Sequence, residues 1–385
     1  MTKIVVIGPG HPLRGGLATF NQRLAKEFIE SGNDCSIYSY SLQYPSFIFP
    51  GTTQYTNEPA PNNLKIHTVI NSINPFNWIK IGHRLKKEKP DLIIVRFWLP
   101  LMGPALGTIL RKVKKNKHTK IICIADNIIP HEKRIGDKLF TKYFLKCCDG
   151  FITMSEKVMS DLRDFVRKDS FGEKTKPARL LAHPMYDNFG AIISKQEARK
   201  YLNLPENDKI ILFFGFIRKY KGLDLLLEAM ADERIRNSEI KLMIAGEFYE
   251  DEKQYLKQIE KLGIKNKLIL KTDFIPDSQV KYYLCAADAL IQPYRNATQS
   301  GVTPLAYHFE KPMIVTNVGG LPAMVTHNES GIITTPEPAS IAGAIVQFFE
   351  SGENKFLPYI REKKKLFSWR TFTTSLLELS DSIQR

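Results

Sequence analysis

The sequence has few cysteines, and they are not spaced to form a metal site or a disulfide framework. Its 385 residues include five, at Cys35, Cys123, Cys147, Cys148 and Cys285, with no CxxC pair, and most lie in apolar stretches. An odd number of such cysteines is typical of a protein from a reducing compartment. The sequence therefore argues against a disulfide-stapled scaffold and against a zinc site.

The sequence also lacks a long uninterrupted apolar run. Its longest apolar tract, "LIIVRFWLPLMGPALGTIL" (92–110), contains Arg96, Pro100, Gly103 and Pro104, whereas a membrane-spanning helix needs about 20 predominantly apolar residues. The start, "MTKIVVIGPG", has no cationic region leading into a long apolar run, so we expect no secretory signal. These absences predict a cytoplasmic protein without a spanning helix.

Acidic residues are scarce in the N-terminal half. Residues 1–185 contain 29 Lys and Arg against 15 Asp and Glu, while residues 186–385 contain 26 against 25, so nearly all of the net charge of +15 lies in the first half. The excess concentrates in "HRLKKEKP" (83–90) and "RKVKKNKHTK" (111–120). Such a patch favours nucleic acid, anionic lipid or a phosphorylated substrate, and the alternative is a solvated helix face.

The pattern of apolar runs predicts an α/β protein of two domains. Short β-branched runs such as "KIVVIG" and "KIICIAD" alternate with amphipathic helices, and the pattern restarts at "KIILFFGFI". Strands alternating with helices indicate parallel sheets covered on both faces. At "LLAHPMYDNFG" (180–190) the apolar pattern gives way to turn residues. We therefore expect domains at 1–185 and 186–365, and a C-terminal helix at 366–385 that packs back toward the first domain.

One stretch places three cations directly after a strand. In "IILFFGFIRKYKGLDLLLEAM" (210–230) the strand leads to Arg218, Lys219 and Lys221, and a helix is expected from Gly222. Ligands of open parallel sheets bind at the carboxyl ends of the strands, and a helix start offers free N–H groups and a positive dipole end. The stretch predicts an anion site suited to two phosphates; the alternative is three cations pointing into water.

A glycine-rich turn follows the first strand. In "GPGHPLRGGLATFNQRLAKEF" (8–28), Gly15 and Gly16 allow a backbone to approach a ligand closely. The spacing is not GxGxxG, and the next strand, "CSIYSY", ends in Ser and Tyr, where a dinucleotide site has an acid for the ribose. A dehydrogenase is therefore disfavoured.

Two further loops carry polar groups at the expected ends of strands. "ADNIIPHEKR" (125–134) places Asp126 after a strand, with His131 close behind, to bind sugar hydroxyls or handle a proton; a turn former and a surface histidine are the alternatives. "NATQSG" (296–301) precedes a helix and offers small polar groups for a phosphate or nucleotide, or a purely structural turn. Its candidate ligand residues are Thr298, Gln299, Ser300 and Gly301.

With these motifs in order, the chain resembles glycosyltransferase family 4, retaining enzymes of the GT-B fold that use nucleotide-sugar donors. The resemblance covers nearly the whole chain and includes "LAKEF", "LDLLLEAM", "MIAGE", "FIPDSQVKYYLCAADALIQPY", "KPMIVTNVGGLP" and "FSWRTF". It implies two Rossmann-like domains whose parallel sheets face across a cleft, with the acceptor on the N-terminal side and the nucleotide sugar on the C-terminal side.

The resemblance also implies roles for residues. Lys221 matches the family's diphosphate-binding lysine, whereas Phe216 stands where the family has an arginine, so Arg218 is expected as the stand-in. Asp126 and His131 are expected to position sugar or acceptor, Asp126 standing where the family often has a histidine. The residues expected to bind the donor are Gly15, Gly16, Gly215, Gly222, Glu247, Thr298, Gln299, Ser300, Gly301 and Val302.

One departure from the family concerns its paired glutamates. Alignment on Pro312 places Ala297 and Leu305 at the two glutamate positions. The donor is therefore left open, and an inactive relative that binds nucleotide sugars or a partner is an alternative. An epimerase of this fold is a second alternative, although it needs carboxylates that "ATQSG" does not supply. Nucleic-acid binding is disfavoured because "RKVKKNKHTK" has no interleaved aromatic residues.

The expected activity is transfer of a sugar from a UDP- or GDP-sugar, with retained configuration, to a lipid-linked glycan in cell-surface polysaccharide synthesis. The chain has no DxD motif, and we expect no metal or other cofactor. The basic stretches "NWIKIGHRLKKEK" and "LGTILRKVKKNK" predict a peripheral enzyme on an anionic membrane, at the inner face.

Overall fold

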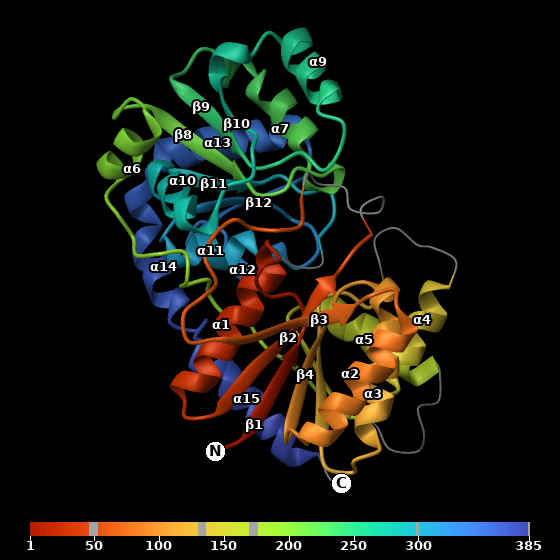
Figure 1. Cartoon of the computed structure of the whole chain (residues 1–385). Helices are drawn as coiled ribbons and strands as arrows, with labels where there is room; N and C mark the ends of the chain where they lie inside the picture. Colours follow the sequence, from red (N-terminus) through yellow and green to blue (C-terminus); the bar gives the residue numbers. More distant parts are fainter. Residues whose placement is uncertain (46–52, 130–135, 169–175, 298–299, 384–385) are drawn as a thin grey trace. The chain divides into compact units, whose positions relative to one another are not determined.

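The computed structural model describes residues 1–45, 53–129, 136–168, 176–297 and 300–383, which form two compact units. Unit 1 comprises Met1–Ala182 together with Trp369–Arg385, and unit 2 comprises His183–Ser368 (Figure 1). Each unit is a parallel sheet layered with helices, so the predicted pair of Rossmann-like α/β domains is confirmed.

The described part of unit 1 contains a seven-stranded parallel sheet in the order β3-β2-β1-β4-β5-β6-β7. Its central strand β4, "LIIVRF", is buried along its whole length, as expected for a strand covered on both faces. The strand order reverses between β1 and β4, and ligands of such sheets bind at this switch point. The strands are β1 Lys3–Ile7, β2 Asp34–Leu42, β3 Lys65–Asn71, β4 Leu92–Phe97, β5 Lys120–Ala125, β6 Gly150–Thr153 and β7 Ala178–Leu180.

The helices of unit 1 are distributed unequally over the two faces of its sheet. Right-handed crossovers place α1 on one face and α2 to α5 on the other, because the chain reverses its direction across the sheet after β3. Asn74 caps α2 by accepting hydrogen bonds from the amides of Phe76 and Asn77. The helices are α1 Gly16–Glu30, α2 Pro75–Glu88, α3 Gly103–Lys114, α4 Asp137–Leu145 and α5 Glu156–Lys168.

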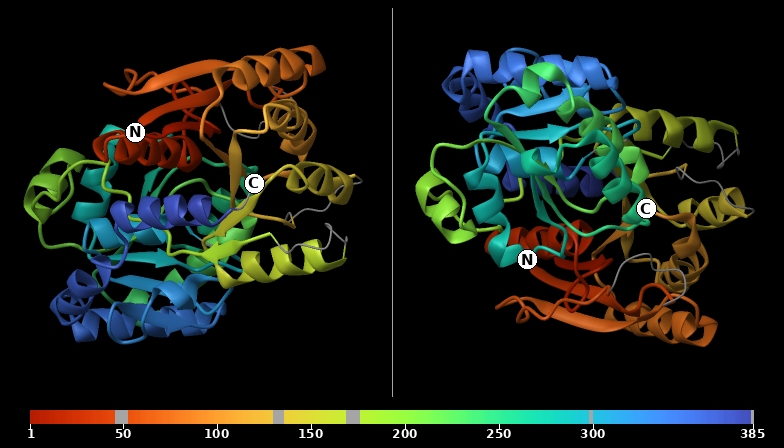
Figure 2. Two further views of the ribbon diagram at one scale, coloured as in Figure 1. Left: turned by 90° about the horizontal axis from the view of Figure 1, so that it is seen from below. Right: turned by 90° about the horizontal axis from the view of Figure 1, so that it is seen from above.

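The last helix, α15 (Trp369–Ser382), lies on the same sheet face as α1 and covers the part of that face that α1 leaves open. It lies beside α1 and contacts β6 (Figure 2). Phe20 of α1 packs edge-on against Trp369 and Phe372, with ring centroids 4.9 and 5.8 Å away. Each such side chain contributes about 1.5–3 kcal/mol when fully buried. The chain therefore leaves unit 1 after Ala182 and returns to complete its core.

The described part of unit 2 contains a six-stranded parallel sheet in the order β10-β9-β8-β11-β12-β13, with its switch point between β8 and β11. Helix α7 contacts both α9 and α13, and α10 packs on α6. The strands are β8 Lys209–Phe214, β9 Ile240–Ala245, β10 Leu268–Lys271, β11 Ala289–Gln292, β12 Met313–Thr316 and β13 Gly331–Thr334. The helices are α6 Lys195–Leu202, α7 Leu223–Met230, α8 Glu233–Arg236, α9 Lys253–Leu262, α10 Val280–Ala286, α11 Val302–His308, α12 Leu321–Met324, α13 Pro338–Ser351 and α14 Leu357–Lys364.

Candidate functional site

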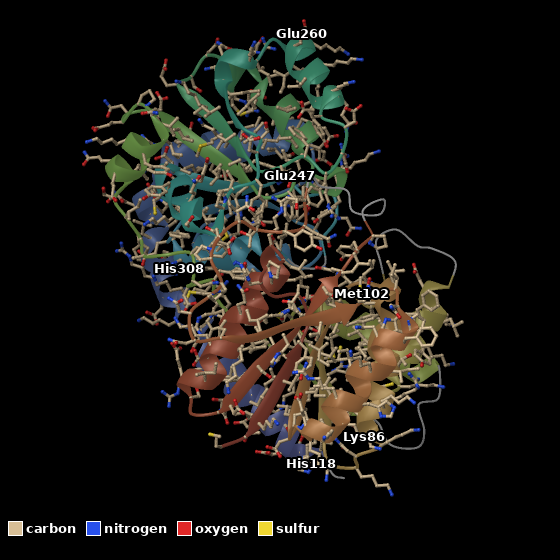
Figure 3. All side chains as sticks on the ribbon, viewed as in Figure 1. Lys86, Met102, His118, Glu247, Glu260 and His308 are labelled. Carbon is tan, nitrogen blue, oxygen red and sulfur yellow. The ribbon has the colours of Figure 1, made fainter. Side chains whose placement is uncertain are left out.

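The carboxyl end of β8 continues as an extended segment beside the residues that follow β9. The amide of Gly215 donates to the carbonyl of Ala245 at 2.9 Å, and the amide of Ile217 donates to the carbonyl of Glu247 at 2.8 Å. Gly215 has φ +90°, and a Cβ at Gly246 would lie 2.4 Å from the Gly215 carbonyl oxygen. Gly215 and Gly246 thus allow the segments after β8 and β9 to stay hydrogen-bonded beyond the ends of the two strands. Glu247 is buried at this edge (Figure 3).

Lys221 is a buried cation at the switch point of unit 2. It lies in a 3₁₀ turn, Lys219–Lys221, before α7, and the residue is only 8% exposed. Its Nζ approaches to 3.3 Å of the position that a Cβ on Gly215 would occupy, and the Val302 side chain meets the same position at 3.8 Å. Among the described residues, none accepts a hydrogen bond from this Nζ. Gly215, Lys221 and Val302 are therefore brought together around one uncompensated ammonium group.

The environment of Lys221 disfavours its own charge. Burial, and secondly the nearby positive charge of Arg218, lowers the pKa of Lys221 from its ordinary value of 10.5 to about 7. A buried cation for which the described residues provide no counterion is suited to receive one from a ligand. An anionic ligand here would restore the ammonium form.

Arg218 lies beside Lys221 but is exposed. Its guanidinium carbon lies 5.0 Å from the ring centroid of Tyr249. The backbone at Arg218 is extended, with φ −139° and ψ 150°, whereas Lys221 lies in the 3₁₀ turn that follows. Two cations thus follow β8: Lys221, which is buried, and Arg218, which is exposed to solvent.

The structure corrects the expected role of the Gly222 amide. This N–H donates to the carbonyl of Lys219 at 3.1 Å and is therefore used within the 3₁₀ turn. Gly222 is required for a different reason: it has φ +68°, and a Cβ there would lie 2.0 Å from the carbonyl oxygen of Pro293. The glycine lets the start of α7 touch the loop after β11, which is a steric role.

The loop after β11 contributes Tyr294, which sequence reasoning did not single out. The ring of Tyr294 lies 5.9 Å from Lys221 Nζ and 6.0 Å from the Tyr220 ring. Its hydroxyl is 3.4 Å from the Ser300 Oγ, and burial raises its pKa. The only signal in the sequence is its place two residues after a strand at the switch point. The aromatic ring of Tyr294 therefore lies next to the buried ammonium group of Lys221.

The predicted residues of the following loop have mixed outcomes. Ser300 Oγ accepts a hydrogen bond from the Val302 amide at 3.2 Å, so it also helps to start α11. A Cβ on Gly301 would touch the buried ring of Tyr186 at 3.5 Å, which places this glycine against protein. Thr298 and Gln299 lie outside the described residues. Of the predicted side chains of this loop that the structure describes, Ser300 is connected to the site, because its hydroxyl contacts the hydroxyl of Tyr294.

The two positions that lack the expected glutamates are apolar and buried. Ala297 and Leu305 are each 3% exposed. Gly319, with φ +55°, approaches so closely that a Cβ there would lie 1.4 Å from the Ala297 carbonyl oxygen. The loops after β11 and β12 are therefore packed directly on each other, without a carboxylate between them.

In unit 1 the glycine turn leads into α1 as predicted. Gly15 has φ 98° and is the N-cap of α1, and its carbonyl accepts from the amides of Ala18 and Thr19. Gly16 is exposed, and the first turn of α1 contains no acidic side chain. The positive end of the α1 dipole is therefore not neutralised within that turn.

Asp126 lies at the predicted strand end, but its carboxylate is occupied. Its Oδ2 and Oδ1 accept from Nε and Nη2 of Arg96 at 2.5 and 2.6 Å, and both side chains are buried. The Arg96 guanidinium also lies 3.9 Å from the centroid of the Phe20 ring. This bidentate pair gives the Asp126 carboxylate a structural role, and sequence reasoning missed Arg96. His131 lies outside the described residues.

No group of three or more His, Cys, Asp or Glu side chains is arranged to hold a metal ion in the described ranges. None of the helices that the structure describes is long and apolar enough to cross a membrane.

Family models match both units of the chain. Residues 14–170 match the model described as Glycosyltransferase Family 4, and residues 194–365 match the model described as Glycosyl transferases group 1. The first matched range lies within unit 1 and the second within unit 2, and together they span most of the chain.

Two curated relatives agree with these matches. An uncharacterised glycosyltransferase of Methanocaldococcus jannaschii is 29% identical over 361 residues, covering 89% of this chain and 88% of the relative. A D-inositol 3-phosphate glycosyltransferase of Corynebacterium urealyticum is 28% identical over 197 residues, covering 49% of this chain and 46% of the relative. With this second relative, the match spans about half the length of either protein.

A solved structure shares the fold over the full length. HepE of Anabaena, in complex with UDP, superposes with a TM-score of 0.71 at 16% identity, covering 99% of this chain and 100% of that one. At this identity the likeness shows the fold alone. Taken with the two family models, it leads to one conclusion: the chain belongs to the GT-B glycosyltransferases of family 4 type.

Proposed function

We propose that this glycosyltransferase transfers a hexose or a related sugar from a UDP- or GDP-sugar, with retained anomeric configuration, to a lipid-linked glycan at an anionic membrane surface. HepE binds UDP in its solved complex, which supports a nucleoside diphosphate donor for a chain of the same fold. The role in cell-surface polysaccharide synthesis follows from the acceptor class.

The observation that carries the proposal is the uncompensated Lys221 ammonium at the switch point of unit 2. The diphosphate of the donor supplies the missing counterion, and Arg218 adds a second cation on its exposed side. As the bond to the sugar breaks, negative charge accumulates on the diphosphate. Cations already in place stabilise that charge without reorganising. In many enzymes such electrostatic stabilisation of the transition state is the largest single contribution to the rate enhancement.

The atoms balance without a protein nucleophile. The bond between the anomeric carbon and the diphosphate oxygen breaks, and the acceptor hydroxyl oxygen bonds to the same face of that carbon. The hydroxyl proton passes to an oxygen of the departing diphosphate. In this scheme Arg218 and Lys221 provide the charge that a metal ion provides elsewhere, so we propose that no metal is needed.

The membrane proposal rests on the outer surface of α2 and α3. Several cations there are already engaged: Arg84 pairs with Glu88 at 2.9 Å, Lys114 pairs with Asp149 at 2.5 Å, and Arg111 donates to the Tyr143 carbonyl at 2.7 Å. Lys80, Lys87, Lys115 and Lys117 are exposed and appear in none of the ion pairs described. Lys86 points outward from the C-terminal end of α2 (Figure 3). Each such cation near an anionic surface contributes about 1 kcal/mol.

The first two turns of α2 and the residue before its N-cap add exposed apolar side chains to this charge. Phe76 is 84% exposed, and Ile73 and Ile79 are exposed beside it. An amphipathic element that combines apolar side chains with lysines is typical of a peripheral membrane contact. This surface supports an acceptor held in a lipid bilayer.

Donor turnover by matched lysine variants tests the proposal. Nucleotide sugars are first screened by thermal shift, because a donor that binds the folded chain stabilises it by an amount that rises with the logarithm of donor concentration over Kd. With the best donor, Lys221→Ala is expected to lose about 100-fold or more in kcat/KM, as when one charge-stabilising group is removed. Lys219→Ala removes an exposed neighbouring cation and is expected to stay within about two-fold. Unchanged turnover by Lys221→Ala would refute the phosphate assignment.

The buried apolar residues at the glutamate positions favour a second candidate. Because Ala297 and Leu305 provide no carboxylate, a protein that binds a nucleotide sugar without transferring it also fits. Slow hydrolysis of the donor in the absence of acceptor separates the two. The transferase releases nucleoside diphosphate over hours, whereas the binding protein shows a thermal shift with no release.

A further inference from the structure

The extended segment after β8 sets which side chains share a face. Successive side chains of a strand point to opposite faces, and Ile217 is fully buried. Phe216 and Arg218 therefore lie together on the face opposite to Ile217. The parallel partner continues the pairing, since the Tyr249 amide donates to the Ile217 carbonyl at 3.0 Å. Tyr249 is thus the cross-strand neighbour of Arg218.

Three aromatic rings form a column that ends at this arginine. The Phe216 and Tyr249 centroids are 4.2 Å apart with planes tilted by 30°, and the Phe216 and Phe274 centroids are 6.4 Å apart with planes at 25°. The Arg218 guanidinium carbon is 5.0 Å from the Tyr249 centroid. Phe274 follows β10, so the column crosses the carboxyl ends of three neighbouring strands.

The backbone under the column is also held. The Glu250 carboxylate accepts from the Lys219 amide at 2.5 Å, and the Tyr255 hydroxyl donates to the same carboxylate at 3.2 Å. The residues on both sides of Arg218 and Tyr249 are therefore tied together. Relative motion of the cation and the ring is restricted to their side chains.

Stacking of this kind leaves the binding groups of arginine available. A guanidinium contacts a ring through its face, while its five N–H donors lie in its plane and point outward. In the described residues no carboxylate pairs with Arg218, so its in-plane donors are not used by an ion pair. The ring restricts a long flexible side chain before the ligand arrives, which lowers the entropy lost on binding.

We propose that Tyr249 is a positioning residue, which holds the Arg218 guanidinium for the donor diphosphate. This inference rests on the proposed function, in which Arg218 meets that diphosphate. It explains how a cation two residues beyond the family's arginine position serves the same face of the chain. Phe216, at the family's arginine position, supports the ring that carries the displaced cation.

A double-mutant cycle tests the proposal, with UDP and GDP as probes and isothermal titration as the measurement. The tighter of the two nucleotides is used throughout. Tyr249→Leu is expected to weaken its binding about two- to five-fold, the range of an exposed cation–π contact, and Tyr249→Phe is expected to restore it. In the Arg218→Ala background, Tyr249→Leu is expected to have no further effect. Tyr201→Leu is the control, since Tyr201 stacks on Tyr282 at 3.6 Å in the same unit.

The outcomes separate this inference from the proposed function. If neither nucleotide binds, or if Arg218→Ala binds as the wild type does, the diphosphate assignment is wrong. If Arg218→Ala weakens binding but Tyr249→Leu does not, the positioning role is wrong. If Tyr249→Leu weakens binding equally with and without Arg218, Tyr249 acts through the fold, and the positioning role is again wrong.

Discussion

Each unit places a buried cation near the switch point of its sheet, and the surroundings of the two cations differ. In unit 1, Arg96 at the end of β4 is 2% exposed and is neutralised by both oxygens of Asp126. In unit 2, Lys221 after β8 is almost as buried, and none of the described residues accepts a hydrogen bond from its ammonium. A buried charge needs a partner. Where the described residues supply that partner, as at Arg96, the charge is structural; where they supply none, as at Lys221, we propose that a ligand supplies it.

Removal of the unit 1 cation is expected to have the largest effect on stability. Arg96→Met leaves the Asp126 carboxylate buried without its bidentate partner, and breaking such a pair costs about 3–5 kcal/mol. The midpoint of urea unfolding measures the loss. Arg96→Met combined with Asp126→Leu removes both charges and is expected to recover most of it. If Arg96→Met alone is as stable as the wild type, the Arg96–Asp126 pair does not stabilise unit 1, and the contrast between the two units is wrong.

Removal of the unit 2 cation is expected to stabilise the ligand-free protein. The pKa of Lys221 in the folded chain, about 7, lies below its ordinary 10.5, so the unfolded chain binds more protons between these values. The wild type therefore carries its full penalty below pH 7 and loses it as the pH rises toward 10.5. We expect Lys221→Met to be more stable at pH 6–7 by on the order of a few kcal/mol.

The pH dependence of this gap is its sharpest test. Unfolding of the wild type and of Lys221→Met is compared from pH 6 to pH 10.5, and the gap is expected to close across that range. Lys219→Met, which changes an exposed lysine, should show no gap that varies with pH. A constant gap for Lys221→Met would mean that the charge of this lysine is not what destabilises the fold.

The contact between α7 and the β11 loop gives a smaller effect. Gly222 and Gly263 have similar φ angles, +68° and +63°, but a Cβ meets the Pro293 carbonyl at 2.0 Å in the first case and nothing within 4 Å in the second. Gly263→Ala is expected to cost about 1–2 kcal/mol from backbone strain alone. Gly222→Ala should cost more and should also weaken UDP binding. If Gly222→Ala and Gly263→Ala lower the free energy of unfolding equally, the loop after β11 moves to accommodate the new Cβ at little cost.

The outer surface of unit 1 is expected to show the smallest effect. Flotation with acidic and neutral liposomes at two salt concentrations measures membrane binding, and Phe76→Ser is expected to weaken binding to acidic vesicles about three- to ten-fold. Leu139→Ser, which changes another exposed apolar residue of unit 1, is the matched control. Equal binding of the wild type to both kinds of vesicle would contradict the membrane proposal.

Much of the fold followed from local pattern. Runs such as "KIVVI" and "KIILFF" are apolar and β-branched over four to six residues, and the helices between them have an apolar stripe, so strands and their parallel arrangement were predictable. The cations after β8 were predictable as well, because they sit next to a glycine at a strand-to-helix junction. These features depend on residues that are close in the chain.

The partners of the charged groups were not predictable in this way. Arg96 and Asp126 are thirty residues apart, and Tyr249 is 31 residues from Arg218. Their contacts depend on which strands are neighbours and on the register between them. The sequence pattern therefore indicates an open polar group at Asp126 and gives no sign of the contact that Tyr249 makes.

The sequence by itself determined the alternation of strands and helices, the family, and the positions where charge leaves a strand, since each depends on residue type and short-range spacing. Only the tertiary structure decided which charge is neutralised and which is left without a counterion. The reason is physical: the free energy of a buried charge is set by the groups that surround it in space, and parallel sheets draw those groups from distant strands.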